Sequence, residues 1–183
     1  QAQEAYRILV ENPTDNISCL FNYQHREESI PIISYMVVKP NMVTSEKIRV
    51  GIVGAGSFIQ MNHLANILEL PRDYEVVAIA EKTTSSAKSI SEKYKPKYVT
   101  TDYKQLLNDP SIDLIIIGTR HNLHAKQVID AITSGKNVLV EKPLAMNHEE
   151  VAMIEAALAA NHNTIVTVGF NRRYSPLTQK VKS

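Results

Sequence analysis

The sequence predicts an α/β protein, a doubly wound parallel sheet with short extensions at both ends, and two observations support this. From Ile48 onward, short apolar runs rich in β-branched residues alternate with segments of helical period. Such alternation is typical of parallel strands joined by right-handed helical crossovers, with helices on both faces of the sheet. In addition, a glycine-rich turn, Gly54-Ala55-Gly56, directly follows the first apolar run.

The composition is that of an ordinary soluble globular protein. The 183 residues carry 20 Lys+Arg against 19 Asp+Glu, a net charge of +1, and 44% are hydrophobic. This balance argues against a nucleic-acid surface, and no apolar stretch approaches the roughly 20 residues of a membrane span. Cys19 is the single cysteine and no zinc-type spacing is present, so we expect no disulfide, no metal site and a cytoplasmic location. The chain begins with Gln1, which indicates processing or a piece of a longer protein.

The elements follow in a regular order. The N-terminal part predicts a short helix over Gln1 to Val10, a strand over Ile17 to Tyr23 and an extended connector with one edge strand over residues 24 to 47. The apolar runs that follow predict five strands: Ile48–Val53, Glu75–Ala80, Asp113–Ile117, Asn137–Val140 and Thr164–Val168. The segments between them predict five helices: Phe58–Leu70, Ser85–Tyr94, Tyr103–Asn108, Leu123–Ser134 and His148–Asn161. For the last helix, Asn147 is the expected N-cap.

The glycine turn predicts a phosphate-binding loop of the Rossmann type. Gly54 would make the tight turn, and Gly56 would let the backbone approach a pyrophosphate. That pyrophosphate would rest on the helix start at Ser57 and Phe58. Ile59 occupies the third position, where Gly or Ala is usual, so we expect the helix to stand slightly further from the sheet. The alternative is a glycine-rich turn that binds no ligand.

An acidic residue at the end of the second strand bears on the choice of cofactor. Glu81 lies 25 positions after Gly56, close to the spacing of the acid that binds the adenosine ribose. It would repel a 2′-phosphate and so favours NAD over NADP. Lys82 and the hydroxyls after it would hold that phosphate if Glu81 turned away, so NADP stays open. A solvated carboxylate without a ligand is the simpler alternative for Glu81.

Two further loops carry reactive side chains. Thr119-Arg120-His121 follows the predicted strand at Asp113–Ile117, and Glu141-Lys142-Pro143 follows the one at Asn137–Val140. Open α/β sheets bind ligands at the carboxyl ends of their strands, so these side chains are expected to converge. Lys142 would hydrogen-bond a substrate oxygen and relay a proton, with Glu141 holding it in place. By itself each histidine, His124 included, is more often a surface or capping residue than a catalytic one.

Four motifs together resemble the Gfo/Idh/MocA oxidoreductases, the family of glucose-fructose oxidoreductase and inositol dehydrogenase, over about residues 47 to 183. They are Gly54-Ala55-Gly56, Thr119 with Leu123-His124, Glu141 to Ala145, and Gly169 to Tyr174. The resemblance implies that Lys142 lies by nicotinamide and substrate, often after a cis bond to Pro143. It also implies that Thr119 and His121 line the nicotinamide ribose and that Asn171 to Arg173 pass near the active site. The expected catalytic residues are Lys142 and Glu141. The expected cofactor-binding residues are Gly54, Gly56, Ser57, Phe58, Glu81, Lys82, Thr119, Arg120, His121, His124, Glu141, Lys142 and Arg173.

The sequence departs from the family pattern at two positions. Thr119-Arg120-His121 stands where Thr-Pro-Asn is usual, and Asn62 replaces a common histidine, with His63 one position late. These departures resemble a subgroup in which this module follows a zinc-type alcohol-dehydrogenase-like half. We therefore expect residues 1–44 to be the tail of a preceding domain plus linker, 45–170 the NAD(P)-binding Rossmann domain, and 171–183 the start of a truncated substrate domain.

The resemblance implies an NAD(P)-dependent dehydrogenase that transfers hydride between nicotinamide and a secondary alcohol of a sugar, cyclitol or nucleotide-sugar. Its partner would be a small sugar-like substrate, with no nucleic acid and no membrane. The oligomeric state stays open: a homo-oligomer through the absent substrate domain, as is common in the family, is one alternative. Because that domain also supplies a catalytic histidine, the chain alone is expected to bind cofactor without turnover. The alternatives are a non-catalytic dinucleotide-binding regulatory module and an assembly domain that binds no nucleotide.

Overall fold

A computed structural model describes Arg7 and residues 47–182. Apart from Arg7, the helix, strand and connector expected before residue 47 lie outside the described residues. None of the helices in the described part of the chain is long and apolar enough to cross a membrane.

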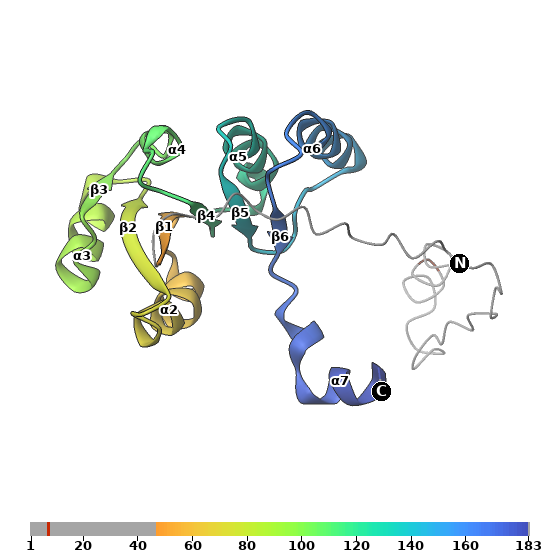
Figure 1. The fold of residues 1–183 in the computed structure, drawn as a ribbon, viewed down its shortest axis with the longest axis horizontal. Helices are drawn as coiled ribbons and strands as arrows, with labels where there is room; N and C mark the ends of the chain where they lie inside the picture. The colour runs from red at the N-terminus through yellow and green to blue at the C-terminus, as the bar shows by residue number, and fades with distance from the viewer. Residues whose placement is uncertain (1–6, 8–46, 183) are drawn as a thin grey trace. The chain divides into compact units, whose positions relative to one another are not determined.

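The described part is built on one sheet of six parallel strands (Figure 1). The strand order is β3-β2-β1-β4-β5-β6, so β1 and β4 are neighbours and the chain changes direction of winding between them. This order confirms the predicted doubly wound α/β fold. The strands are β1 (Ile48–Val53), β2 (Tyr74–Ala80), β3 (Tyr98–Thr100), β4 (Leu114–Ile117), β5 (Asn137–Val140) and β6 (Val166–Val168).

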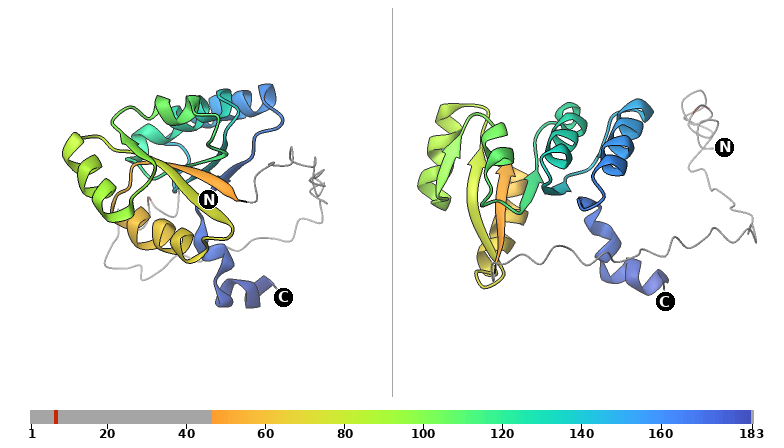
Figure 2. Two further views of the ribbon diagram at one scale, coloured as in Figure 1. Left: turned by 60° about the vertical axis from the view of Figure 1, so that its left-hand side comes forward. Right: turned by 45° about the horizontal axis from the view of Figure 1, so that its top comes forward.

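Helices cover both faces of the sheet, as Figure 1 and the turned views of Figure 2 show. One face carries η1, α2 and α3, and the other carries α4, α5 and α6. A short 3-10 turn and a last helix follow β6. The helical elements are η1 (Ile59–Leu64), α2 (Ala65–Glu69), α3 (Thr84–Tyr94), α4 (Lys104–Asn108), α5 (His121–Thr133), α6 (His148–Ala160), η2 (Asn171–Tyr174) and α7 (Pro176–Lys182).

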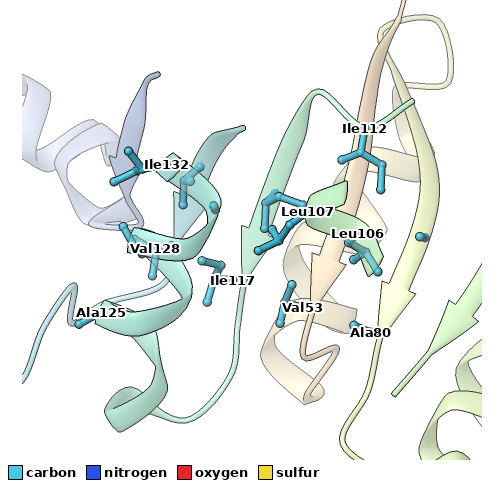
Figure 3. Close-up of a cluster of buried hydrophobic side chains, with 14 of the residues drawn as sticks. Val53, Ala80, Leu106, Leu107, Ile112, Ile117, Ala125, Val128 and Ile132 are labelled. Atoms are coloured by element: carbon cyan, nitrogen blue, oxygen red, sulfur yellow. The ribbon is translucent and has the colours of Figure 1, made fainter. Parts of the chain in front are cut away.

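Two apolar clusters hold these layers together, one on each face. Successive strand residues point to opposite faces, so Ile116 belongs to the cluster under η1, α2 and α3, whereas Ile115 and Ile117 belong to the other. Figure 3 shows side chains of α4 and α5 gathered over Val53 and Ile117. Because β1 and β4 are buried on both faces, they consist almost entirely of apolar residues, and each buried Ile contributes about 1.5–3 kcal/mol.

The structure departs from the predicted elements in two ways. The strand β3 was not predicted, because its three half-buried residues give no recognisable alternation. The helix after the glycine turn begins with a π-helical segment, η1, instead of regular α-helix. The other elements predicted from Ile48 onward occur with bounds that shift by at most two residues. Asn147 caps α6 as expected, with its Oδ1 accepting a hydrogen bond from the Glu150 N–H at 2.9 Å.

Candidate functional site

A cleft of about 310 Å³ opens at the carboxyl ends of β1, β4 and β5. It lies beside the point where the winding of the sheet reverses, which is where open α/β sheets bind ligands. Eight of the expected site residues line it together with Ile59 and Gly118. The lining is Gly56, Ser57, Phe58, Ile59, Gly118, Thr119, His121, His124, Glu141 and Lys142.

The glycine turn forms one wall of the cleft. Gly54 has a φ of 81° and leaves no room for a side chain, because a Cβ there would lie 2.8 Å from the Thr119 methyl group. At Gly56, by contrast, a Cβ would meet no atom within 4 Å. The helix starts at Ser57, directly after Gly56, and glycine has no side chain that could cap its first N–H groups. A bare turn before an uncapped helix start fits a pyrophosphate.

Gly118 accommodates the bulky residue at the third position of the turn. Ile59 is 1% exposed, and a Cβ on Gly118 would lie 2.1 Å from the Ile59 Cγ1 atom and 2.9 Å from the Gly54 carbonyl oxygen. The absence of a side chain at Gly118 therefore lets Ile59 pack down between helix and sheet. Sequence reasoning did not single out Gly118, because its role appears only when two loops meet.

The carboxylate of Glu81 is fastened to the glycine turn. Its Oε1 accepts a hydrogen bond from the Ala55 N–H at 2.5 Å, while Lys82, the next residue, is exposed. Thr83 caps α3, with its Oγ1 accepting from the Ser86 N–H at 3.2 Å. Glu81 thus stands at the end of β2 next to the turn, outside the cleft lining, in the region expected for an adenosine ribose.

Two buried polar side chains of α5, Gln127 and His124, form hydrogen bonds to the loops that line the cleft. The Thr119 hydroxyl donates to the Gln127 Oε1 at 2.6 Å. The ring nitrogens of His124, which is fully buried, lie 2.7 Å from the Pro143 carbonyl oxygen and 3.1 Å from that of Thr119. His124 therefore ties the loop after β4 to the loop after β5. Gln127 was missed, although a glutamine on the apolar face of a helix is the kind of signal that marks a buried partner.

Glu141 contacts a residue that the sequence did not place in the site. Its Oε1 lies 2.6 Å from the His63 Nε2, and a Cβ on Gly169 would lie 2.8 Å from the same oxygen. Three elements therefore meet at this carboxylate: the end of β5, the π-helical segment η1 and the end of β6. Because a carboxylate only accepts, the His63 Nε2 carries the proton.

Lys142 projects into the cleft without an ionic partner among the described residues. It is exposed, and its peptide bond to Pro143 is cis, as expected. The pairing expected between Glu141 and Lys142 is not formed, because Glu141 binds His63 instead. An ammonium that faces a cleft unpaired is available to a ligand oxygen.

The remaining expected residues lie at the margin. His121 lines the cleft edge-on to the His124 ring, at 5.7 Å between centroids, and Arg120 is exposed just before α5. Arg173 folds back on its own turn, where its Nε donates to the Phe170 carbonyl oxygen at 3.1 Å. The structure therefore brings Thr119, His121, Glu141 and Lys142 together with the glycine turn, and it leaves Arg173 outside the lining.

Comparison with known proteins agrees with this geometry. The model of the oxidoreductase family with an NAD-binding Rossmann fold, Gfo/Idh/MocA, matches residues 48–170. The chain is 32% identical over 135 residues to inositol 2-dehydrogenase of Acidothermus cellulolyticus, covering 74% of this chain and 39% of that protein. It is 33% identical over 134 residues to trans-1,2-dihydrobenzene-1,2-diol dehydrogenase of Xenopus tropicalis, covering 73% and 40%.

A solved structure shows the same relationship. The 3-ketoreductase KijD10 of Actinomadura kijaniata, in complex with TDP-benzene and NADP, matches with a TM-score of 0.67 at 27% identity, covering 74% of this chain and 42% of that chain. The chain spans about 40% of the length of the curated relatives it matches.

Proposed function

This chain belongs to the Gfo/Idh/MocA oxidoreductase family, with its NAD-binding Rossmann fold, and from that premise we propose that it is the NAD(P)-binding part of a dehydrogenase. The reaction is hydride transfer between nicotinamide and a secondary alcohol carbon. The substrate class is a sugar, a cyclitol or a nucleotide-sugar. Relatives named inositol 2-dehydrogenase and dihydrobenzenediol dehydrogenase support a substrate with vicinal hydroxyl groups.

One observation carries the proposal: a bare glycine turn, the helix start behind it and a lysine with no ionic partner among the described residues face one cleft. The first two would hold a pyrophosphate, and the third would meet the alcohol or carbonyl that exchanges hydride. The bound dinucleotide supplies the hydride chemistry. A neighbouring group must then take the hydroxyl proton when the alcohol is oxidised, or return it on reduction.

The chain's own residues would act on binding, orientation and that proton. Ser57 and Phe58 offer backbone N–H groups to the phosphates. Thr119, fixed by its bond to Gln127, would contact the nicotinamide ribose. Lys142 would hydrogen-bond the reacting oxygen and relay its proton, and His121 would border the same space.

Glu81 supports a preference for NAD. Its carboxylate is held by the Ala55 N–H at 2.5 Å, so turning it away to admit a 2′-phosphate would break a charge-assisted hydrogen bond. A fixed carboxylate accepts hydrogen bonds from ribose hydroxyls and repels a phosphate.

Calorimetric titration of the 183-residue chain with NAD, NADH, NADP and NADPH tests the proposal. We expect saturable binding of at least one pair, tighter for NAD than for NADP. Absence of binding by all four at millimolar concentration would refute the proposed function.

Replacing Glu81 by alanine tests the cofactor preference. Without the carboxylate, Lys82 and the hydroxyls after it remain to receive a 2′-phosphate, so the ratio of NADP to NAD affinity should rise about tenfold. Glu92→Ala, which removes an exposed carboxylate from α3, is the matched control and should leave the ratio unchanged. A ratio that does not move in Glu81→Ala would show that Glu81 plays no part in cofactor choice.

A further inference from the structure

Two opposite charges face the cleft and do not pair. Histidines aside, Glu141 and Lys142 are the charged side chains among the described residues that line it. They follow one another directly after β5, and Glu141 pairs with His63 instead of with Lys142. Opposite charges that share a partly enclosed cleft attract each other, so the position of the Glu141 carboxylate depends on what else holds it. The contacts of Glu141 show what holds its carboxylate.

His63 holds the Glu141 carboxylate on one side. Its Nε2 donates to the Glu141 Oε1 at 2.6 Å, with the two side chains only 22% and 13% exposed. The His63 ring in turn packs edge-on against Phe58, at 5.9 Å between centroids. On the other side of the carboxylate, Gly169 presents no side chain, so the Glu141 oxygen can settle against the end of β6. The carboxylate is thus held from η1 and accommodated by β6.

The π-helical segment explains how His63 reaches this position. A π turn contains about one residue more than an α turn. Side chains that follow the wide turn are therefore set back by roughly one position around the helix axis. His63 lies in this segment, and its ring reaches the Glu141 carboxylate just beyond the carboxyl end of β5.

We propose that His63 is a positioning residue, which holds the Glu141 carboxylate away from Lys142 and so leaves the lysine free to meet a ligand oxygen. Removing the imidazole releases the carboxylate into the cleft, where Lys142 is the cation within reach. An ion pair between them would occupy the ammonium and favour its charged form.

This inference rests on the proposed function for what Lys142 does to a substrate. Its physical content, that Glu141 stays off Lys142 because of His63, concerns only the chain itself. It can therefore be tested without cofactor or substrate.

The test is the rate at which Lys142 is acetylated by an N-hydroxysuccinimide ester, followed by peptide mass spectrometry of the 183-residue chain. The neutral amine is the nucleophile, so an ion pair that favours the ammonium slows the reaction. In His63→Leu we expect Lys142 to react about three- to tenfold more slowly than in the wild type, as a carboxylate at close range lowers the neutral fraction. Lys88 and Lys104, both exposed and on other elements, are internal controls whose rates should not change.

Two further variants separate positioning from a general loss of structure. His63→Gln retains a side-chain N–H that can donate to Glu141 and should restore most of the Lys142 rate. Combining His63→Leu with Glu141→Gln leaves no carboxylate to move, so the leucine should then have no effect beyond that of Glu141→Gln alone.

A separate route to the same release is Gly169→Ala, whose methyl group would press on the Glu141 oxygen at 2.8 Å. It should slow Lys142 acetylation in the same direction, and it keeps the test available if His63→Leu does not fold. Circular dichroism and thermal melts identify which variants fold.

Two results would overturn the inference. The first is an acetylation rate of Lys142 that is the same in the wild type as in His63→Leu or, if that variant does not fold, in Gly169→Ala. The second is that His63→Leu slows acetylation of Lys142 just as much when Glu141 has been replaced by glutamine. Failure of the chain to bind any dinucleotide would instead overturn the proposed function and leave the acetylation result standing.

Discussion

The two ends of the same parallel strands are built in opposite ways. At the amino ends of β1 and β4, Arg49 and Asp113 satisfy each other: the Arg49 Nε and Nη2 donate to the two Asp113 carboxylate oxygens at 2.9 and 2.7 Å. Nearby, the Lys136 Nζ donates to the carbonyl oxygens of Asp109 and Ile112 at 2.6 and 2.8 Å. At the carboxyl ends, Lys142 has no such partner among the described residues, and Gly56 leaves empty space.

The difference separates stability from function on one scaffold. At the amino ends, the pKa of Asp113 is lowered, chiefly because Arg49 donates a hydrogen bond to its carboxylate. The two charged side chains are therefore already paired with each other in the folded chain. Polar groups at the carboxyl ends keep part of their hydrogen-bonding capacity for a ligand. Substitutions at the amino ends should therefore change folding, and those at the rim of the cleft should change binding.

The largest effect on stability is expected at Gly118, which is an exception to this division. Gly118 lies at the carboxyl end of β4, but the buried side chain of Ile59 packs directly against it. A methyl group on Gly118 would overlap Ile59 and approach the Gly54 backbone. Gly118→Ala should therefore lower the free energy of unfolding by about 3 kcal/mol, measured by urea denaturation. Gly56→Ala is the matched control, since its methyl group would meet no atom within 4 Å. Equal stability of the two variants would contradict the packing described between helix and sheet.

The next largest loss of stability is expected at the amino ends of the strands. Asp113→Asn removes the negative charge that accepts the hydrogen bonds of Arg49. It should lower the unfolding free energy by about 2 kcal/mol at pH 7. Cofactor affinity should stay within about twofold. Calorimetric titration alongside denaturation checks both, and a loss of affinity without a loss of stability would reverse the assignment of the two ends.

The same pair gives a pH dependence of known sign. Because the folded-state pKa of Asp113 is lowered by Arg49, its contribution is present above the unfolded pKa of about 3.9 and is lost as the pH falls through the folded value. The stability difference between wild type and Asp113→Asn should therefore narrow below about pH 4. Denaturation curves between pH 7 and pH 2 measure it, and a gap that widens in acid would contradict the interaction.

A smaller effect on folding, with a clear effect on binding, is expected at Gly56. Since the space beside it is open to solvent, Gly56→Ala should change the unfolding free energy by less than about 0.5 kcal/mol. It should weaken dinucleotide binding about tenfold, because the backbone can no longer approach the pyrophosphate closely. Unchanged affinity in calorimetric titration would show that the phosphates lie elsewhere.

The two ends also differ in how far the sequence could predict them. The order of apolar runs and helices was sufficient for the fold class, because alternation is a local property of the chain. The glycine turn and Lys142 were found from motifs for the same reason. The contacts of Gly118 with Ile59 and of His63 with Glu141 join segments far apart in sequence, so no local pattern records them. The strand β3 was missed because three residues are too few to show a period.

The smallest change in folding free energy is expected at Lys142, and it sharpens the comparison most. Its ammonium is exposed and has no partner among the described residues, so Lys142→Ala should leave the unfolding free energy within about 0.5 kcal/mol of the wild type. Cofactor affinity should stay within a few-fold. If Lys142 relays the proton as proposed, turnover by an active enzyme that contains this chain should be abolished. Arg49→Ala, which removes a charge from the amino ends of the same sheet, should do the reverse and destabilise the fold while leaving the cleft intact. Undiminished turnover in Lys142→Ala would remove this lysine from the proposed mechanism.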